Sequence, residues 1–361
     1  MNIKRIVMGL LLISVVMALP GCNKNVKTKE NEPIVIVVDE DEVEAVSDET
    51  LAVNPLTGLM IDKEVARRRP VAVMINNIRV ATPQSGISQA DIIYETLAEG
   101  NITRLVAVFQ DFDSQKIGPV RSTRHYYLNI AFDHDAIFVH HGGSPQAFES
   151  IKRLEPANLN SLSYLESIMA WRDPIRSKKR GMYEHSLYTS AEGIQKAWNK
   201  VGYREERKND LDWKFSFTNE ENIPMVGDKA EIVVVPFSKD YTSSFKYIEK
   251  DMIYSRFQFG EAHIDENNNE QLKVKNIIIQ YANIKHIPGD SEGRRDIDLV
   301  GQGQGLYISN GKAVPITWRK NAYDDVTKYR DEEGKILKIN KGKTWICIFP
   351  NNSEIQLEEY N

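Results

Sequence analysis

Cysteine is almost absent from this chain, which has only Cys22 and Cys347 among its 361 residues. Since Cys22 is expected to carry a lipid (see below), Cys347 would have no partner, and an intramolecular disulfide framework is excluded. Cys347 lies in the strand-like run KTWICIFP, so we expect a small buried core residue there rather than a catalytic thiol.

An excess of positive charge is also lacking, because 46 lysines and arginines face 51 acidic residues and the formal net charge is −5. This balance provides no global basic field and argues against a nucleic-acid partner. The acids concentrate in residues 23–50, which carry nine acids and three lysines and leave residues 51–361 near neutrality. The remaining composition, 41% hydrophobic and 27% charged, is typical of a globular protein with room for two domains.

Long apolar runs are confined to the N-terminus, where IVMGLLLISVVMA follows the basic MNIKR and is short for a membrane span. The next residues, LPGC, have the pattern of a bacterial lipoprotein cleavage site, in which the thiol of Cys22 takes a diacylglycerol. We therefore predict a lipoprotein signal peptide over residues 1–22 and a protein lipid-anchored through Cys22 on the extracytoplasmic face of the membrane. The alternatives are an uncleaved membrane anchor or a secretory signal cut elsewhere.

Residues 23–53 are polar and acidic and contain no aromatic side chain, so they cannot bury a core and are predicted to form a disordered tether. The apolar IVIVV within them receives no assignment. Residues 351–361 are interpreted as a polar tail.

Residues 54–205 have the pattern of an α/β domain. A buried strand is expected over residues 69–77, and two apolar runs within 90–110 predict a hairpin that turns at Gly100 and Asn101. Helices are expected from residue 121, from the N-cap Ser144, and from a capping box of Thr189 and Glu192 that ends at Gly202. After a linker over 206–228, short β-type runs separated by turns predict a β-rich domain over 229–350. The expected fold is thus an α/β domain with a mixed sheet and helices, followed by a β-rich domain.

The stretch FVHHGGSPQAFES, residues 138–150, is the first candidate for a functional site. His140 and His141 are neighbours in a strand and should point to opposite faces, and no metal-ligand spacing or cofactor motif occurs in the chain. Ser144 lacks the glycine two residues later that a nucleophile elbow requires, and it suits a helix N-cap. Gly142 and Gly143 would expose backbone N–H groups at a strand end, where a plain turn or an oxygen ligand is equally compatible.

The stretch GPVRSTRHYY adds Arg121 and Arg124, which we expect in the first turn of a helix, where positive charge opposes the helix dipole. An internal carboxylate, Glu95 or Glu99, would explain them, and so would the carboxylate, phosphate or sulfate of a ligand. Arg104 and His185 could join either arrangement. Several aromatic residues in the same region suggest a carbohydrate ligand, although core packing explains any single one of them: Tyr126, Tyr127, Trp171, Tyr183 and Tyr188.

The strings RPVAVMINN, PQSGISQADIIYE, EGNITRLVAVFQ, IGPVRSTRHYY and FVHHGGSPQA resemble the YerB-like lipoproteins of Gram-positive bacteria. GLYISNGKAVPITWRK and GKTWICIFP resemble the C-terminal half of that family. The resemblance implies a lipoprotein signal and two successive domains of unknown function, and it supplies no activity and no site residues.

Three functions are compatible with these patterns. The first is a cell-envelope binding module that holds an anionic or carbohydrate ligand with the residues Arg104, Arg121, Arg124, His140, Gly142, Gly143, Ser144 and His185. The second is a glycan or peptidoglycan hydrolase with acid–base chemistry by His140, His141 or His185 and an orienting Glu95 or Asp135. The third is an assembly factor that binds a protein partner through the β-rich domain.

Overall fold

The computed structural model describes residues 50–208, 214–220 and 226–360. These residues belong to one compact unit. The predictions for the signal peptide, Cys22, the IVIVV stretch and most of the tether lie outside the described residues. Among the helices that the structure describes, none is long and apolar enough to cross a membrane.

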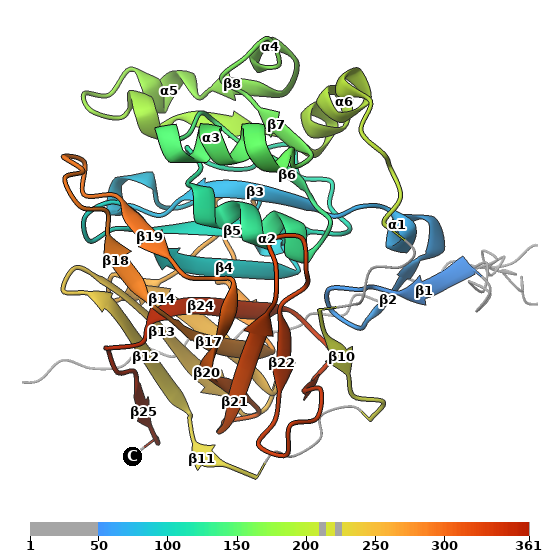
Figure 1. Ribbon diagram of the computed structural model, residues 1–361, viewed down its shortest axis with the longest axis vertical. Coiled ribbons are helices and arrows are strands. Elements are labelled where there is room, and N and C mark those ends of the chain that lie inside the picture. Colours follow the sequence, from blue (N-terminus) through green and yellow to red (C-terminus); the bar gives the residue numbers. More distant parts are fainter. Residues whose placement is uncertain (1–49, 209–213, 221–225, 361) are drawn as a thin grey trace, which may run out of the picture. The chain divides into compact units, whose positions relative to one another are not determined.

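A central sheet of eleven strands runs through both regions that the sequence distinguishes. Its strands follow one another from top to bottom in Figure 1, beginning with β7 and ending with β21 and β11. The first five in this order belong to the α/β region: β7 (Asn158–Asn160), β6 (Ile137–His140), β3 (Val71–Asn76), β5 (Thr103–Phe109) and β4 (Ile92–Leu97). The others belong to the β-rich region: β24 (Thr344–Pro350), β17 (Asn276–Ala282), β20 (Gly301–Ser309), β21 (Lys312–Lys320), β11 (Asp228–Lys229) and β22 (Lys328–Arg330), which also pairs with β21.

The two regions are joined by parallel pairing of β24 with β4, in which Cys347 lies opposite Glu95. The hydroxyl of Thr96 on β4 also donates to the Ile348 carbonyl on β24, at 2.8 Å. Cys347 is fully buried at this junction, as expected for a core residue. The α/β and β-rich regions therefore share one continuous sheet.

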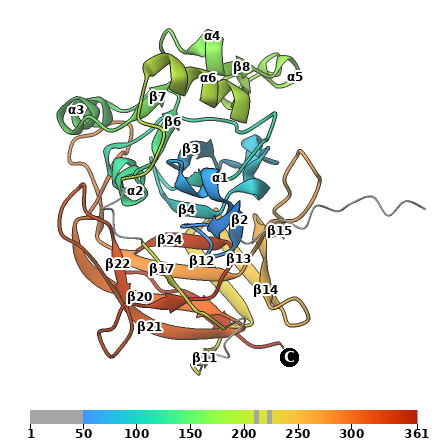
Figure 2. The same ribbon diagram turned by 90° about the vertical axis from the view of Figure 1, so that its right-hand side faces the viewer.

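A second sheet of six strands belongs to the β-rich region. In Figure 2 its strands β12, β13 and β14 lie beside β17 and β24. Val233, Phe245 and Tyr254 of this sheet belong to one buried cluster with Ile277 and Trp345 of the central sheet. The six strands are β15 (Glu261–Ala262), β14 (Ile253–Gln258), β13 (Tyr241–Ile248), β12 (Ile232–Ser238), β25 (Gln356–Glu358) and β16 (Lys273–Val274).

All helices in the described part of the chain belong to the α/β region. Tyr127 and Leu128 at the start of α2 pack with Met74 and Val106 on one face of the sheet. On the other face, Ile194 and Trp198 of α6 pack in the cluster that contains Val73. The helices are α1 (Lys63–Arg67), α2 (Leu128–Asp133), α3 (Pro145–Leu154), α4 (Glu166–Met169), α5 (Pro174–Ser177) and α6 (Ala191–Val201).

Short elements complete the fold. The 3₁₀ turns are η2 (Arg79–Ala81), η3 (Ile87–Gln89), η4 (His125–Tyr127) and η5 (Tyr183–His185). The two-stranded pairs are β1 (Leu51–Val53) with β2 (Met60–Asp62), β8 (Ala170–Arg172) with β9 (Leu187–Thr189), β10 (Ser216–Phe217) with β23 (Lys338–Ile339), and β18 (Ile284–His286) with β19 (Arg295–Ile297).

The predicted fold class is confirmed: a mixed sheet with helices is followed by a strand-rich region. The hairpin over 90–110 is present, and Ser144 caps α3 by accepting from Ala147 N. Two local predictions were wrong. The N-cap of α6 is Ser190, one residue after Thr189, because the Ser190 side chain accepts from Gly193 N. Arg121 and Arg124 precede the helical segment, which begins at His125, because residues 121–124 are extended and pair with other segments.

Candidate functional site

The carboxyl ends of three parallel strands, β3, β6 and β7, meet at one edge of the central sheet and carry Asn76, His140 and Asn160. The extended segment 121–124 runs alongside residues 141–144 at this edge. Its contacts are His141 N to Arg121 O at 3.1 Å, Thr123 N to Gly142 O at 3.0 Å and Ser144 N to Thr123 O at 3.2 Å. The two stretches singled out in the sequence therefore lie side by side, at the kind of strand end where α/β proteins place ligands.

Backbone N–H groups at the Gly-Gly turn donate to acceptors within the protein. Gly142 N donates to Asn160 Oδ1 at 2.9 Å, and Ser144 N is used by Thr123. Gly142 has φ of +70°, and a Cβ on Gly143 would lie 3.2 Å from the Thr123 side chain. The positive φ thus explains Gly142, and close approach of the 121–124 segment explains Gly143. The protein itself occupies two of the donors that were expected to face a ligand.

Arg104 and Arg124 converge on an internal carboxylate, that of Glu99. Arg104 lies 2.9 Å from it and donates to the Ser122 carbonyl at 2.6 Å, while Arg124 contacts the same carboxylate and donates to the Thr123 carbonyl. Both guanidinium groups are buried, which lowers their pKa. Of the two internal partners proposed from the sequence, Glu99 is the one that these arginines contact.

Arg121 and His185 lie nearer the surface. Arg121 Nη2 forms an ion pair with Glu184 at 2.7 Å. Asn76 Nδ2 lies 2.8 Å from His185 Nδ1, and Asn76 Oδ1 accepts from Ile78 N, so the amide donates to the imidazole. Burial, followed by the charge of Arg121, lowers the pKa of His185. This pair is the part of the predicted binding set that a ligand could reach.

The two neighbouring histidines have different environments, as the strand alternation predicts. His140 is fully buried and donates from Nδ1 to the Gly142 carbonyl at 2.8 Å. His141 is half-buried, with Nδ1 at 3.0 Å from Ser161 Oγ and Nε2 at 3.4 Å from Arg172 Nη2. Since a guanidinium can only donate, Nε2 of His141 accepts and its Nδ1 carries the proton toward Ser161. The serine is therefore not activated by this imidazole.

The carboxylates proposed for acid–base chemistry lie elsewhere. Glu95 contacts Arg256 at 2.9 Å and is buried between the two sheets. Asp135 contacts Arg69 at 3.2 Å and Arg204 at 2.8 Å. Within the described residues, no hydrogen bond joins His140, His141 or His185 to a carboxylate. The structure does not assemble the predicted catalytic set into one site.

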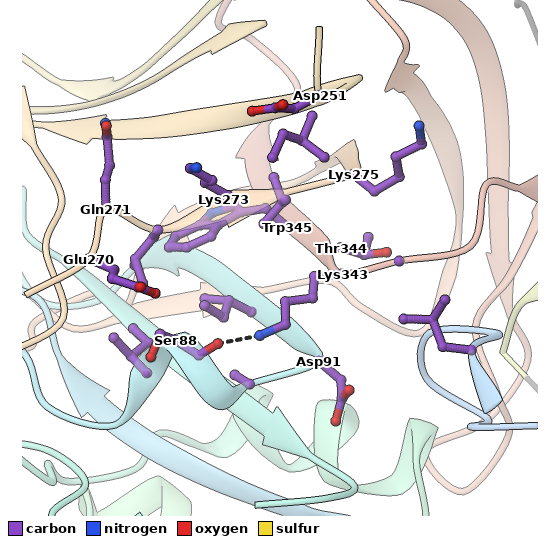
Figure 3. A pocket seen from close by; sticks show the side chains of 18 of the residues that line it. Ser88, Asp91, Asp251, Glu270, Gln271, Lys273, Lys275, Lys343, Thr344 and Trp345 are labelled. Atoms are coloured by element: carbon purple, nitrogen blue, oxygen red, sulfur yellow. Dashed lines mark hydrogen bonds between the residues drawn. The ribbon is translucent and has the colours of Figure 1, made fainter. Parts of the chain in front are cut away.

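A pocket that we did not predict from the sequence lies at the amino ends of β4 and β24, where the second sheet meets them; we call it the lysine pocket (Figure 3). Its volume is about 440 Å³, within the range typical of small-molecule sites. One part of its wall is apolar and consists of Leu59, Ile87, Ala90, Ile93, Ile253, Leu272, Val274 and Trp345. Its charged residues are Asp91, Asp251, Glu270, Lys273, Lys275, Lys341 and Lys343.

Two charged groups are held deep in the lysine pocket. The Lys343 ammonium donates to the Ser88 carbonyl, the bond drawn as a dashed line in Figure 3, and burial lowers its pKa. The Asp91 carboxylate accepts from Gln110 N at 2.7 Å and from Asn54 Nδ2 at 3.1 Å. Burial raises the pKa of Asp91 to about 6. Perturbed groups in a hollow of this size mark a candidate binding site.

The sequence contains a weak signal for this pocket, namely alternating lysines in LKVK and in KGK just before two strands. Alternation in a strand is usually the exposed face of a sheet, so the pattern by itself predicts solvated side chains. What brings the lysines to one hollow is the parallel pairing of β17 with β24, in which Asn276 lies opposite Thr344 and the backbone N–H of Lys275 donates to the Lys343 carbonyl at 2.9 Å.

Comparisons with known proteins agree with the fold. The N-terminal domain of a protein family of unknown function, DUF3048, matches residues 56–204, and the C-terminal domain of the same family matches residues 233–346. "Putative lipoprotein YerB" of Bacillus subtilis is 36% identical over 301 residues, which cover 82% of this chain and 86% of that protein. The crystal structure of YerB from Bacillus subtilis has a TM-score of 0.73 and 35% identity, and the match covers 84% of this chain and 99% of that one. This chain is therefore a member of the DUF3048 family of lipoproteins of unknown function.

Proposed function

We propose that this protein is anchored by a lipid on Cys22 to the extracytoplasmic face of the membrane and binds a small anionic cell-envelope ligand with an apolar part in the lysine pocket. The observation that carries the proposal is the Lys343 ammonium, which is largely buried beside an apolar wall. An ammonium has three donors, and the described contacts of this one include a single hydrogen bond, to Ser88 O. A ligand anion would supply further acceptors and offset the desolvation of the charge.

The shape of the pocket adds to this argument. The apolar residues, among them Ile87, Ile253 and Leu272, lie on the same hollow as the lysines. A ligand that places an alkyl or aromatic group on this wall and an anionic group at Lys343 would satisfy both surfaces. A purely polar ligand would leave the wall unused, and a neutral alkyl chain would give the Lys343 ammonium no further acceptor.

The test is calorimetric titration of the full-length protein with octyl phosphate below its micellar concentration, with octanol and inorganic phosphate as controls. Octyl phosphate should bind most tightly, and Lys343→Met should weaken it by roughly 10- to 100-fold, as expected for loss of a hydrogen bond to a charged group. Lys338→Met, at an exposed lysine of β23, is the matched control and should leave binding unchanged. Equal affinity of the Lys343→Met variant and the wild type would contradict this site.

A second candidate site is the strand-end edge, with Arg121, His141, Arg172 and His185 as its accessible basic groups. The observation that favours it is electrostatic proximity: the charges of Arg172 and Arg121 both depress the pKa of His141, after the larger effect of burial. This proximity supports an anionic or carbohydrate envelope ligand. Muropeptide binding by the full-length protein that falls with Arg121→Gln, and not with Lys338→Gln, would support it, and unchanged binding would remove it.

The hydrolase alternative lacks geometric support, because the three histidines have no described carboxylate partner and Ser161 is not activated. The partner-binding alternative was placed on the β-rich region. Exposed large apolar side chains gather instead in the α/β region, where residues 148–183 contain six of the fourteen found in the described chain.

A further inference from the structure

The exposed apolar side chains of the α/β region accompany a run of basic residues. Ile175 is 72% exposed, Tyr183 is 59% exposed and Trp171 is 39% exposed. Between them lie Arg176, Lys178, Lys179 and Arg180, so that residues 171–183 contain five basic residues and one acid, Asp173. This charge is opposite in sign to the net charge of the chain, −5. We call residues 171–183 the basic loop.

The acid of the basic loop is already neutralised. Asp173 accepts from Ile175 N and Arg176 N as the cap of α5 and pairs with Lys116 at 3.3 Å. Arg176 pairs with Glu266 at 3.4 Å. Lys178, Lys179 and Arg180, in contrast, are exposed and have no ion pair within the described residues. Three cations are thus left to face solvent or an external anion.

The basic loop is held in a defined conformation. Arg172 donates to the Tyr183 carbonyl at 2.7 Å, and its guanidinium lies over the Tyr183 ring, 4.0 Å from the centroid. Arg176 donates to the carbonyls of Ala81 and Pro83, at 3.1 and 2.9 Å. The fold therefore fixes both ends of a segment that exposes an isoleucine and a tyrosine, although burying these side chains would be favourable.

The location of the basic loop agrees with a surface that binds something large. α5 and β8 lie with α4 at the top of Figures 1 and 2, at the end of the central sheet that β7 forms and away from β11 and β21. The neighbouring loop before α4 exposes two more apolar side chains, Leu162 at 57% and Tyr164 at 67%. An exposed apolar group that is interleaved with lysine and arginine is the composition of a membrane-interface segment.

We infer that the basic loop docks on the anionic surface of the membrane, with Ile175 and Tyr183 entering the headgroup region and Lys178, Lys179 and Arg180 binding lipid phosphates. The occupant is a lipid bilayer that contains anionic lipid. Cys22 would hold the molecule near that bilayer, and the tether of 27 residues between Cys22 and Thr50 could span up to about 90 Å when extended. The loop would orient a molecule that its lipid already retains.

This inference does not depend on ligand binding in the lysine pocket, which is formed by other segments. Docking would bring the strand-end edge close to the bilayer, because Glu184 and His185 directly follow the basic loop and contact Arg121 and Asn76. Occupancy of either candidate site is not required for docking.

The experiment uses the mature chain from residue 22 with Cys22→Ala, which carries neither the lipid nor the apolar run of residues 6–18, in sedimentation with vesicles. Binding to phosphatidylglycerol vesicles should exceed binding to phosphatidylcholine vesicles and fall with salt. The triple variant Lys178→Gln, Lys179→Gln, Arg180→Gln should lower the partition coefficient by roughly 100-fold, at about tenfold or less per basic residue. The matched control replaces three exposed lysines of the β-rich region, Lys250, Lys285 and Lys338, by glutamine and should retain binding.

A second measurement tests insertion of the apolar side chains. In the Cys22→Ala background the remaining Cys347 is fully buried, so an environment-sensitive dye can be placed at Ile175→Cys or, as a control, at Lys335→Cys. The dye at position 175 should shift to the blue on phosphatidylglycerol vesicles, and the control dye should not.

Three outcomes would overturn the inference. One is failure to bind phosphatidylglycerol vesicles, and another is an equal loss of binding by the control triple variant. The third is an equal response of the dye at position 175 to a water-soluble polyanion such as dextran sulfate, which would assign the basic loop to a polymer rather than a bilayer. Octyl phosphate binding should be unchanged in the triple variant. A failure of membrane docking can therefore be distinguished from a failure of ligand binding in the lysine pocket.

Discussion

Two buried charge centres hold the α/β and β-rich regions together, and they are built on different principles. The Glu95 centre contains Glu95 and Arg256, whose side chains are 1% and 0% exposed. The Asp133 centre contains Asp133 with Lys214 and Lys320, whose side chains are 5%, 2% and 0% exposed. The first balances one acid against one base, and the second places two cations on one carboxylate.

The Glu95 centre is a closed network. Oε1 of Glu95 accepts from Asn77 and Thr103, and Oε2 accepts from Ser243, Arg256 and Trp345, at 2.7 to 3.2 Å. The contributors come from the second sheet and from both halves of the central sheet. Because opposite charges and nearly all donors are matched, this centre fixes the register between the sheets.

The Asp133 centre joins α2 to the β-rich region. Lys214 lies 2.5 Å and Lys320 lies 2.8 Å from the carboxylate, which also accepts from the backbone and hydroxyl of Thr327. Although burial alone would raise it, the two ammonium groups hold the pKa of Asp133 well below its usual range. Burial lowers the pKa of Lys214 to about 8. One positive charge is therefore in excess.

The two centres are both buried but differ in charge balance, so we expect them to contribute differently to stability. The Glu95 centre holds equal numbers of opposite charges, whereas the excess cation of the Asp133 centre is held at a free-energy cost that deprotonation of Lys214 can relieve. Removing the carboxylate should therefore be more damaging in the Asp133 centre, and removing one cation should be more easily tolerated there.

The largest effect is expected for Asp133→Asn, which leaves two buried ammonium groups without a counter-charge. We expect a loss in the free energy of unfolding of about 5 kcal/mol, at the upper end for a broken buried pair. Urea unfolding of the full-length protein measures it. Asp240→Asn, at an exposed position, is the control and should change stability little. A loss of less than about 1 kcal/mol would contradict the view that the Asp133 carboxylate balances the buried lysines.

A smaller effect is expected for Glu95→Gln, which leaves one buried cation, Arg256, with three other acceptors: Ser243 Oγ, Gln258 Oε1 and His263 Nδ1. The expected loss is about 3 kcal/mol, because the guanidinium remains hydrogen-bonded but unbalanced. The double variant Glu95→Gln, Arg256→Met should recover part of the loss, and a double-mutant cycle of urea unfolding measures this coupling. Additive losses would show that the pair does not act as a unit.

The carboxylates proposed for the hydrolase, Glu95 and Asp135, illustrate what the sequence could predict about the site. Either was proposed to orient a histidine that acts as acid or base. Arg256 lies 161 residues from Glu95 and Arg69 lies 66 residues from Asp135, and such distant pairings cannot be predicted from spacing. Glu99, five residues from Arg104, was within reach of local reasoning and was proposed as an internal partner.

For the fold, too, local contacts could be predicted from the sequence and distant pairings could not. The hairpin of β4 and β5 and the cap of α3 were predictable because a turn at Gly100 and a Ser-Pro sequence act over a few residues. The continuous sheet was not predicted, since the parallel pairing of β24 with β4 joins residues about 250 positions apart. The lysine pocket arises at that junction, so it was hidden for the same reason.

The smallest effect concerns the excess cation. The pKa of Lys214 is about 8 in the folded protein, against the ordinary value of 10.5. Between these values the unfolded chain binds a proton that the folded chain has released. Stability should therefore rise as the pH increases from about 8 toward 10, by at most about 1.4 kcal/mol per pH unit for one proton.

Lys214→Met isolates this contribution, since Asp133 keeps Lys320 and Thr327 as partners. Burial also lowers the pKa of Lys275 and Lys343, but those groups are present in both proteins, so the difference between the two pH profiles reports on Lys214. Urea unfolding from pH 7 to 10 measures the free energy of unfolding of both proteins. At pH 7 the variant should be at least as stable as the wild type. Above pH 8 its free energy of unfolding should rise less steeply with pH. A Glu95→Gln series over the same range should keep the wild-type slope, because that change leaves Lys214 untouched. If Lys214→Met also kept that slope, the cation of the Asp133 centre would not be the group that titrates, and the contrast between the two centres would rest on geometry alone.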